Sequence, residues 1–334
     1  MKTTTLALSL LSVVSCASAP RGGPKLDPST ALCPRPEGDA RCLPVARAEK
    51  LLEDGELRVV NVAGAGSSTA GALTMWLEFP SAGLTLKAKW KESAHGGSAL
   101  NNEPRKELAA YALQKLFLEP EEYVVPPTQA RCIPLDYYQV QVRPARPTFS
   151  NTGCVLGVLA YWIDGLRELH GFDAARFADD VKYREAIANL NLLTYLLDHR
   201  DTRAANFLIS KDKDEPRVFS IDNGLALSGL YNPRAAFMHE WEHIIVPKVP
   251  HAKIERLRRL TRADLDRLGT VAEFAVHGGQ LDAIATTAAF DGDHGVREKD
   301  GVIQLGLTRA EIDGIASRLK ALIERVDAGK LEAY

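Results

Sequence analysis

A polar loop in the second half of the chain brings together residue types that suit phosphoryl transfer. It contains Asp201, Arg203 and Asn206, and Asp222 follows after two short apolar segments. Phosphoryl transfer depends on positioning and charge neutralisation more than on covalent help from the protein. Asp201 could lie near the attacking hydroxyl, and Arg203 could meet the transferred group. Asn206 and Asp222 offer the hard oxygen atoms that a divalent metal prefers.

The same stretch resembles the catalytic centre of the protein-kinase-like superfamily. From His199 to Asn206 it matches the H-R-D-x-x-x-x-N pattern of a kinase catalytic loop. Two expected strands, Phe207–Ser210 and Arg217–Ile221, follow as a hairpin with a charged turn. Asp222 then leaves the hairpin where kinases carry the aspartate of their D-F-G motif. Order and context therefore agree over the whole stretch.

The sequence Ile-Asp-Asn-Gly-Leu-Ala around Asp222 is most similar to the atypical branch of this superfamily. That branch includes type II phosphatidylinositol 4-kinases, Golgi casein-kinase-type secretory kinases, and HipA-like and CotH-like bacterial kinases. Aminoglycoside phosphotransferases are similar at the loop, but usually have an aromatic residue where this chain has Asn223. The resemblance implies an enzyme that uses ATP with Mg²⁺ or Mn²⁺. Asp201 would orient or deprotonate an acceptor hydroxyl, Arg203 would stabilise developing charge, and Asn206 with Asp222 would hold the metal.

A glycine-rich turn upstream is a candidate for binding the nucleotide phosphates. It contains Gly64 and Gly66 and separates segments 57–63 and 72–79, which have strand character. Kinases cover the phosphates of ATP with such a strand–turn–strand unit, whose backbone N–H groups approach the anion. A plain hairpin is the other interpretation of this pattern.

Two lysines of the next segment are candidates for contact with the nucleotide. Residues 84–91 alternate apolar and basic side chains, which predicts a strand with one solvated face. The dipeptide of Trp90 and Lys91 resembles the aromatic-Lys-Pro signature of related atypical kinases, although glutamate replaces the proline here. Lys91 is therefore the first candidate and Lys89 the second.

Glu107 is the candidate partner of that lysine. It lies in Glu103–Phe117, whose apolar stripe predicts a helix. The sequence Glu-Leu-Ala-Ala-Tyr from Glu107, and the Val-Val-Pro-Pro-Thr that follows, resemble the type II phosphatidylinositol 4-kinases. The resemblance implies that Glu107 pairs with the strand lysine and keeps it aimed at the phosphates. A surface glutamate is the alternative.

The expected fold is α+β, with the two lobes of a kinase. Residues 51–152 would form a small lobe of antiparallel strands plus the Glu107 helix, and residues 153–334 a larger, mainly helical lobe. Segment 135–142 is expected to be a strand, and residues 155–163 to connect the lobes.

The larger lobe is expected to be built from helices with recognisable starts. Residues 183–197 should form a buried helix that delivers the catalytic loop. Beyond Asp222 the chain should be mostly helical. Thr261 and Thr308 each begin a capping pattern followed by an amphipathic run.

The N-terminus predicts export. Residues 1–16 resemble a bacterial lipoprotein signal peptide, with an apolar run too short to span a membrane and Cys16 as the lipidated residue. Residues 17–50 are rich in Pro, Gly and Ala near their start and should form a tether. The protein would then lie in the cell envelope and contact the membrane through its lipid. Plain secretion is the alternative.

The remaining cysteines, Cys33, Cys42, Cys132 and Cys154, fit this location. Four cysteines in an exported chain suggest two disulfides. Pairing of neighbours, Cys33 with Cys42 and Cys132 with Cys154, is the simplest arrangement, although sequence leaves the connectivity open. None has C-x-x-C spacing, which argues against a zinc or redox site.

Composition and other motifs limit the alternatives. The 334 residues are 46% hydrophobic and 25% charged, with a net charge of −2, which argues against a general nucleic-acid binder. His239–His243 fits the H-E-x-x-H pattern of zinc hydrolases, but no third ligand is obvious. Asp291–Gly295 suggests a cation loop but lacks the other EF-hand ligands, which favours a surface loop.

Two further functions share the expected fold. One is an inactive kinase-like module used for docking, which an exported location favours because ATP is scarce there. The other is transfer of AMP instead of phosphate. The sequence leaves the acceptor open among protein, lipid and sugar.

Overall fold

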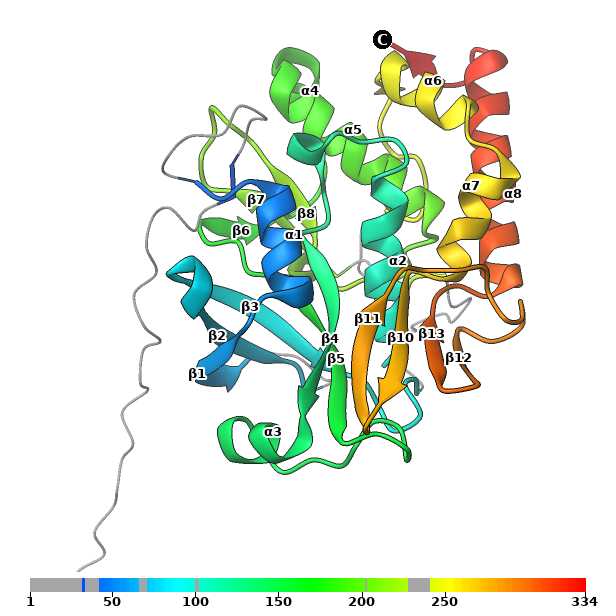
Figure 1. Ribbon diagram of the computed structural model, residues 1–334. Coiled ribbons are helices and arrows are strands. Elements are labelled where there is room, and N and C mark those ends of the chain that lie inside the picture. The colour runs from blue at the N-terminus through cyan, green and yellow to red at the C-terminus, as the bar shows by residue number, and fades with distance from the viewer. Residues whose placement is uncertain (1–31, 34–41, 66–70, 100–101, 202, 228–240) are drawn as a thin grey trace, which may run out of the picture.

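The protein has a mixed α+β fold, as expected, in a computed structural model that describes residues 32–33, 42–65, 71–99, 102–201, 203–227 and 241–334 (Figure 1). Antiparallel sheets dominate the lower half of the molecule in Figure 1, and helices dominate the upper half. The predicted signal peptide with Cys16, most of the predicted tether, and Gly66 lie outside the described residues.

A five-stranded antiparallel sheet forms the first layer. Its strands, in spatial order, are β1 (Arg58–Gly64), β2 (Leu73–Phe79), β3 (Leu84–Glu92), β5 (Cys154–Tyr161) and β4 (Thr128–Pro134). The predicted alternation of β3 is confirmed on its apolar face, because Leu86, Ala88 and Trp90 are all buried. Strand β5 pairs with both β3 and β4, so the sheet continues past residue 152, where the sequence had suggested a domain boundary.

The helix α1 (Val45–Asp54) corrects the predicted extent of the tether. Residues 45–50 had been assigned to the tether, but they are helical. Leu43, Ala48 and Leu52 are buried in the core that covers β1 to β3. Burial of this apolar face keeps the segment on the sheet.

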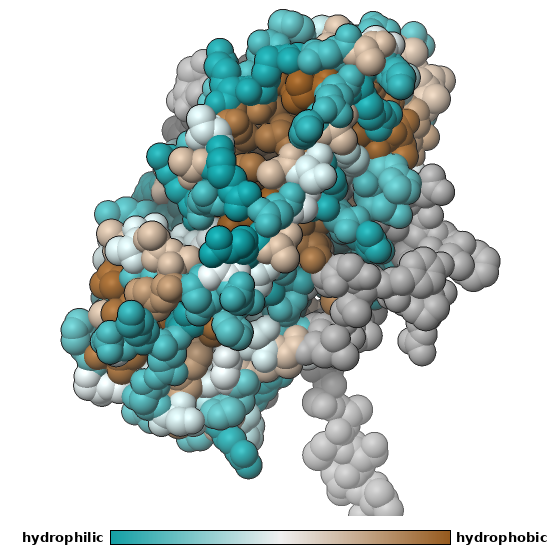
Figure 2. All heavy atoms as spheres, turned by 90° about the vertical axis from the view of Figure 1, so that its right-hand side faces the viewer, coloured by the Kyte–Doolittle hydropathy of each residue, from teal (hydrophilic) through white to brown (hydrophobic). Residues whose placement is uncertain are grey.

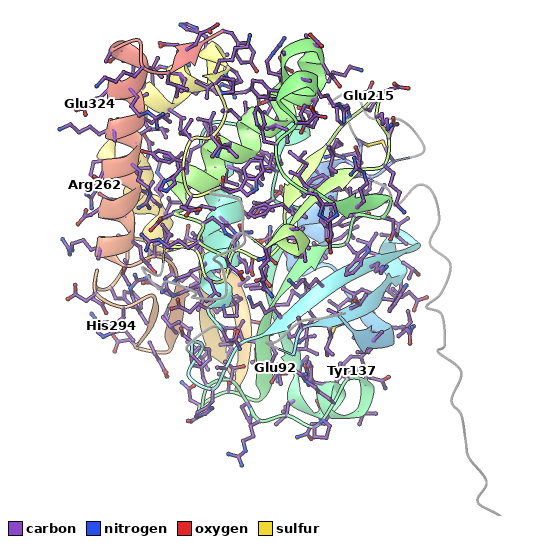
Figure 3. All side chains as sticks on the ribbon, turned by 180° about the vertical axis from the view of Figure 1, so that it is seen from behind. Glu92, Tyr137, Glu215, Arg262, His294 and Glu324 are labelled. Carbon is purple, nitrogen blue, oxygen red and sulfur yellow. A yellow bond between two sulfur atoms is a disulfide. The ribbon has the colours of Figure 1, made fainter. Side chains whose placement is uncertain are left out.

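Segment 135–142 is a helix, α3 (Leu135–Gln141), and the predicted strand was wrong. Tyr138 is fully buried and its hydroxyl accepts a hydrogen bond from Trp90 Nε1 at 3.0 Å. The same hydroxyl donates to Glu92 at 2.8 Å. The backbone N–H of Val59 donates a hydrogen bond to the Tyr137 hydroxyl at 2.8 Å. Figure 3 labels Tyr137 and Glu92 in the lower part of the molecule. These contacts outweigh the strand preference of Tyr and Val.

A second sheet also departs from the expected, mostly helical C-terminal part. It contains β11 (Gln280–Ile284), β10 (Ala272–His277), β13 (Val302–Leu305) and β12 (Val296–Lys299), in that order. Its hairpin turns use residues with positive φ: Gly278 with Gly279, and Asp300 with Gly301. Such turns match the twist of paired strands. Phe274 and Ile303 then pack against β4 and β5, which explains why these strands form.

The helices pack around one large core. They are α2 (Pro104–Gln114), α4 (Ala174–Asp179), α5 (Val181–Leu196), α6 (His251–Arg258), α7 (Arg262–Asp266) and α8 (Arg309–Asp327). The capping boxes predicted at Thr261 and Thr308 are confirmed. The short strands β9 (Lys248–Val249) and β14 (Glu332–Ala333) pair beside α6. Figure 2 shows the face formed by α6 to α8, where hydrophobic side chains lie between the more numerous hydrophilic ones.

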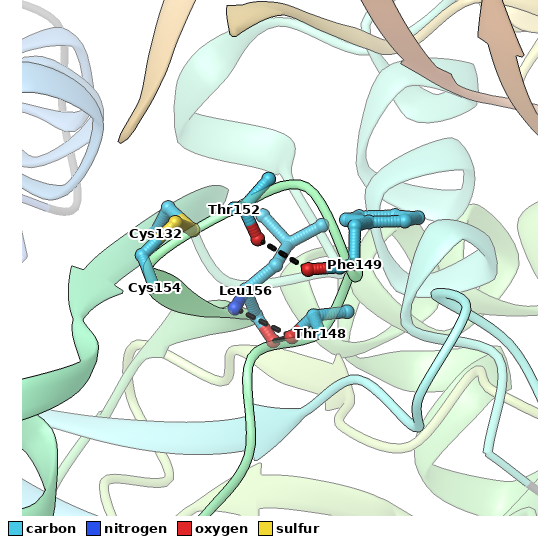
Figure 4. The surroundings of a disulfide bond; sticks show 6 residues. All are labelled: Cys132, Thr148, Phe149, Thr152, Cys154 and Leu156. Carbon is cyan, nitrogen blue, oxygen red and sulfur yellow. Dashed lines mark hydrogen bonds between the residues drawn. A yellow bond between two sulfur atoms is a disulfide. The ribbon is translucent and has the colours of Figure 1, made fainter. Parts of the chain in front are cut away.

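Both disulfides suggested by the sequence are present, Cys33–Cys42 and Cys132–Cys154. The second joins β4 to β5 beside a turn held by bonds of Thr148 and Thr152 (Figure 4). Two disulfides indicate an oxidising, non-cytoplasmic location. Within the described part of the chain, each helix is too short or too polar to cross a bilayer.

Removal of the Cys132–Cys154 bridge should destabilise the protein. The bridge closes a loop with a sequence separation of 22, and replacing both residues by alanine should lower the free energy of unfolding by about 3 kcal/mol. The matched control removes Cys33–Cys42, whose separation is 9, and should cost less. Urea unfolding of the two double variants checks the order, and a larger loss in the control would contradict it.

Candidate active site

The polar loop after α5 is held by a buried histidine. His199 has no exposed surface and packs on Phe207, with ring centroids 5.2 Å apart. Its Nε2 lies 3.1 Å from the carbonyl oxygen of Asp222, so Nε2 carries the proton and donates. Burial lowers the pKa of His199, which keeps the ring neutral. The histidine therefore fixes the loop against the backbone that carries Asp222.

Asp201, Arg203 and Asn206 lie together in this loop, as the sequence predicted. Arg203 donates two hydrogen bonds to the Asp201 carboxylate, at 2.8 and 2.9 Å. Asn206 donates from its amide to the Asp201 backbone oxygen at 2.8 Å. The hairpin strands follow as β7 (Phe207–Ser210) and β8 (Val218–Ser220), and β7 also pairs with β6 (Leu166–Glu168). Ile221 N–H donates to the Asn206 carbonyl, which brings the end of β8 back to the loop.

Lys91 connects three elements that are far apart in the sequence. Its side chain extends from β3, and only 5% of the residue is exposed. Nζ lies 3.0 Å from Glu107 Oε1 on α2 and 3.0 Å from Asp222 Oδ1 after β8. The other Glu107 oxygen accepts the backbone N–H of Asn223 at 2.8 Å. The predicted pairing of Lys91 with Glu107 is thus present, and Asp222 extends it.

Opposite charges determine how the buried members of this group ionise. Burial alone would lower the pKa of Lys91, but the carboxylates of Glu107 and Asp222 outweigh it and raise that pKa above its usual range. Burial alone would raise the pKa of Asp222, but the positive charges of Lys89 and Lys91 outweigh burial and lower that pKa below its usual range. At neutral pH Lys91 is therefore protonated and Asp222 is ionised.

Lys89 also reaches the site, so the basic face of β3 is not simply a solvated face. Its Nζ donates to the Ile221 carbonyl at 3.2 Å and lies 3.5 Å from Asp222 Oδ2. Lys87, further along the same face, lies over the Trp162 ring, with Nζ 4.1 Å from the centroid. The alternation of β3 therefore places Lys89 and Lys91 against Asp222 while its apolar residues enter the core.

A cavity of about 330 Å³ opens beside Lys89 and Glu107. It lies between β3, the end of β5 and the β7–β8 hairpin, and its size is typical of small-molecule sites. Its apolar wall includes Val125, Ala160, Leu166, Leu208 and Ile221. The segment Tyr161–Gly165, near the residues expected to connect the lobes, forms one side. Gly64 ends β1 but is not among the lining residues described.

Gly224 is a site residue that motif reading did not single out. A Cβ atom at this position would collide with Lys91 Nζ and would lie 3.4 Å from Glu107 Oε1. The missing side chain therefore makes room for the Lys91–Glu107 pair. The Asp-Asn-Gly sequence contained this residue, but a role in close approach depends on a contact across the fold that sequence spacing does not reveal.

The metal ligands predicted by the sequence are few but chemically suitable. No group of three or more His, Cys, Asp or Glu side chains that could hold a metal occurs among the described residues. Asn206 and Asp222 offer one amide and one carboxylate. Such a pair fits a hard cation that also takes oxygens from phosphates and water, as Mg²⁺ does.

Neither rival motif belongs to a group of three or more metal-binding side chains among the described residues. Of the H-E-x-x-H motif, His239 and Glu240 lie outside the described residues. Trp241 is buried, and Asn191 donates to the backbone oxygen of His243 at 2.7 Å. Asp291 accepts two backbone N–H bonds within its own exposed loop, as expected for a surface turn.

Comparison with known proteins assigns no family. No family model matches the chain, and no curated protein matches it. The chemistry of the site therefore carries the functional argument.

Substituting Gly224 by alanine should disturb Lys91. The added methyl would displace the amine from its carboxylates, with an expected loss of about 1–3 kcal/mol in the free energy of unfolding. Gly64→Ala is the matched control, because nothing lies within 4 Å of its added carbon. Urea unfolding of both variants checks the difference, and equal stabilities would show that Lys91 adapts without cost.

The buried His199 should make stability depend on pH. Its folded pKa lies below the usual 6.5, so the unfolded chain binds a proton that the folded chain refuses. Stability should therefore fall as the pH is lowered below 6.5, by up to about 1.4 kcal/mol per pH unit from this residue. Unfolding of the wild type and His199→Asn at pH 7 and pH 5.5 measures this slope, which should be smaller in the variant.

Proposed function

We propose that the protein is an exported ATP-dependent phosphotransferase with a kinase-like, two-lobed fold. The observation that carries the proposal is the Lys91–Glu107–Asp222 chain beside a cavity of about 330 Å³. Kinase chemistry needs a lysine for the phosphates, a glutamate that holds it and an aspartate for the metal. Here all three side chains meet, and Asp201 belongs to the adjoining loop.

The arrangement of the elements supports the two lobes. The five-stranded sheet with α2 would be the small lobe, and the helices around α5 the large one. The cavity lies where β5 leaves the sheet and the chain continues through Trp162 to Asp164. The second sheet, β10 to β13, packs against the small lobe, although it follows the large-lobe helices in sequence.

The cavity offers complementary surfaces for a nucleotide. Its apolar wall, with Val125, Leu208 and Ile221, would receive the flat adenine ring. Lys89 and Lys91 would then meet the phosphates. Asn206 and Asp222 would hold Mg²⁺ or Mn²⁺. The metal, when bound, would neutralise charge on the phosphate oxygens.

The transfer step follows from the loop. The acceptor oxygen would form a bond to the γ-phosphorus while the bond from that phosphorus to the β–γ bridging oxygen breaks, which releases ADP. Asp201 would orient the acceptor hydroxyl and receive its proton. Arg203 holds both oxygens of that carboxylate in the free protein, so it pre-orients Asp201 and places a positive charge near the transferred group.

A docking module with the same fold is the second candidate. The two disulfides favour it, because they indicate an oxidising location, where ATP is scarce. The intact lysine, glutamate and aspartate favour the enzyme, since a module that only docks has no need of a buried, charge-balanced lysine.

Transfer should fail when Asp201 is changed, while nucleotide binding persists. Asp201→Asn should lower turnover about 10²- to 10⁴-fold, because it removes the proton acceptor. Asp222→Asn should instead weaken metal-dependent nucleotide binding. Intact mass after incubation with ATP and Mg²⁺ or Mn²⁺ measures phosphate gain, and isothermal calorimetry measures binding.

The control for this experiment is Asp179→Asn, an exposed carboxylate on α4. It should behave as the wild type. A gain of AMP in place of phosphate would change the reaction but keep the nucleotide site. No mass gain and no nucleotide binding by the wild type would contradict the proposed enzymatic function and favour the docking module.

A further inference from the structure

A buried ion-pair cluster ties the start of α2 to α8. The Arg105 guanidinium donates to both oxygens of Glu311, at 2.7 and 3.0 Å, and to the backbone oxygen of Gly306 at 3.0 Å. Lys106 is also buried and lies 3.5 Å from Glu311. Glu103 contacts both basic residues. Bidentate pairing with low exposure makes this a well-defined link between distant segments.

The position of these cations on α2 is unfavourable without nearby carboxylates. Arg105 and Lys106 lie in the first turn of the helix, where the backbone dipole repels positive charge. Glu311 and Glu103 offset this repulsion. The Glu311 carboxylate also accepts the backbone N–H of Thr308 at 2.8 Å and so caps α8. One carboxylate therefore serves the starts of two helices.

The segment from β12 to α8 is shaped around Arg105. A Cβ atom on Gly295 would collide with the guanidinium. Gly306 supplies a carbonyl to Arg105, and its N–H donates to Gly295 at 2.9 Å. Gly306 can approach Gly269 closely because it has no side chain. These glycines form a cradle that fits closely around the Arg105 side chain. A salt bridge on the protein surface would not need such a close approach of the backbone.

Arg105 and Glu107 point from α2 in different directions. Arg105 contacts Glu311 at the C-terminal segment, while Glu107 contacts Lys91 and Asn223 at the proposed nucleotide site. Figure 1 shows α2 in the centre of the molecule, between these regions. Rotation or withdrawal of α2 would break both sets of contacts together.

We propose that Arg105 is a positioning residue for the nucleotide site, and that the C-terminal segment from residue 295 to Glu311 acts as a built-in element that holds α2 in place. The proposal rests on the proposed function. Its consequence is that Glu107 stays on Lys91 without a partner protein and without modification of the chain. The cradle holds α2 in place through Arg105, α2 keeps Glu107 beside Lys91, and Glu107 fixes the position of the Lys91 amine.

The test uses the full chain and two readouts. The first is nucleotide-free: the rate at which a low concentration of acetic anhydride acylates Lys91, measured by peptide mass spectrometry against exposed Lys320. The second is the dissociation constant for ATP with Mg²⁺. The variants are Arg105→Met and Gly295→Ala. We call them the clamp variants, because they disrupt the contact between α2 and the C-terminal segment from its two sides. Arg105→Lys should restore part of the effect, because it keeps the charge but not the bidentate geometry.

The matched control is Arg184→Met. Arg184 is partly buried on α5, outside the 295–311 segment, and its guanidinium donates to the backbone oxygens of Phe177 and Ala178 and to no residue of α2 in the described bonds. Both clamp variants should acylate Lys91 about tenfold faster and weaken ATP binding about tenfold, whereas the control should change neither. In a Glu107→Gln background, Arg105→Met should add little, because the two residues act in series.

The outcomes separate the two proposals. Wild-type acylation rates in both clamp variants would overturn the positioning role. So would an equal increase in Arg184→Met, which would indicate a general loss of stability. If the wild type binds no ATP while the clamp variants still expose Lys91, the proposed function fails and the positioning of Lys91 by Arg105 stands.

Discussion

The buried amine of Lys91 is the constraint on which the site depends. A cation removed from water without partners would cost several kcal/mol, so Lys91 requires carboxylates within hydrogen-bond distance. Glu107 and Asp222 supply them from α2 and from the end of the β7–β8 hairpin. The chain must therefore bring a strand, a helix and a hairpin to one point. Gly224 leaves the space in which this is possible.

Buried polar contacts hold these elements in the necessary order. The Gln114 amide at the end of α2 accepts from the backbone N–H groups of Val124 and Val125 and donates to the Val125 carbonyl. Ser220 on β8 in turn donates its N–H to the Val124 carbonyl at 2.7 Å. A continuous path thus runs from α2 to the strand that precedes Asp222. Because the Gln114 amide and the backbone groups of Val124 and Val125 satisfy one another, a shift of one element would leave the others unsatisfied.

Short sequence motifs predicted those site residues that lie within the motifs themselves. The alternation of β3 predicted a face of lysines, and the resemblance to atypical kinases singled out Lys91, then Lys89, and Glu107. The same reasoning failed for residues 135–142, where the buried Tyr138 is satisfied by Trp90 and Glu92 in a helix. It also missed the second sheet, although Asp300 with Gly301 is a hairpin signal. Gly224 and Arg105 were missed because their partners are distant in sequence.

The free site is balanced in charge before any ligand arrives. Lys89 and Lys91 face Glu107 and Asp222, and Arg203 faces Asp201, so each charge already has an opposite neighbour. Under the proposed function, a metal–nucleotide complex would therefore exchange partners within the site. In that proposal, the phosphate oxygens would contact Lys89 and Lys91, and the Asp222 carboxylate would be available to hold the metal. Since the lysines already hold Asp222 ionised, against the effect of burial, that carboxylate needs no deprotonation before it binds a cation.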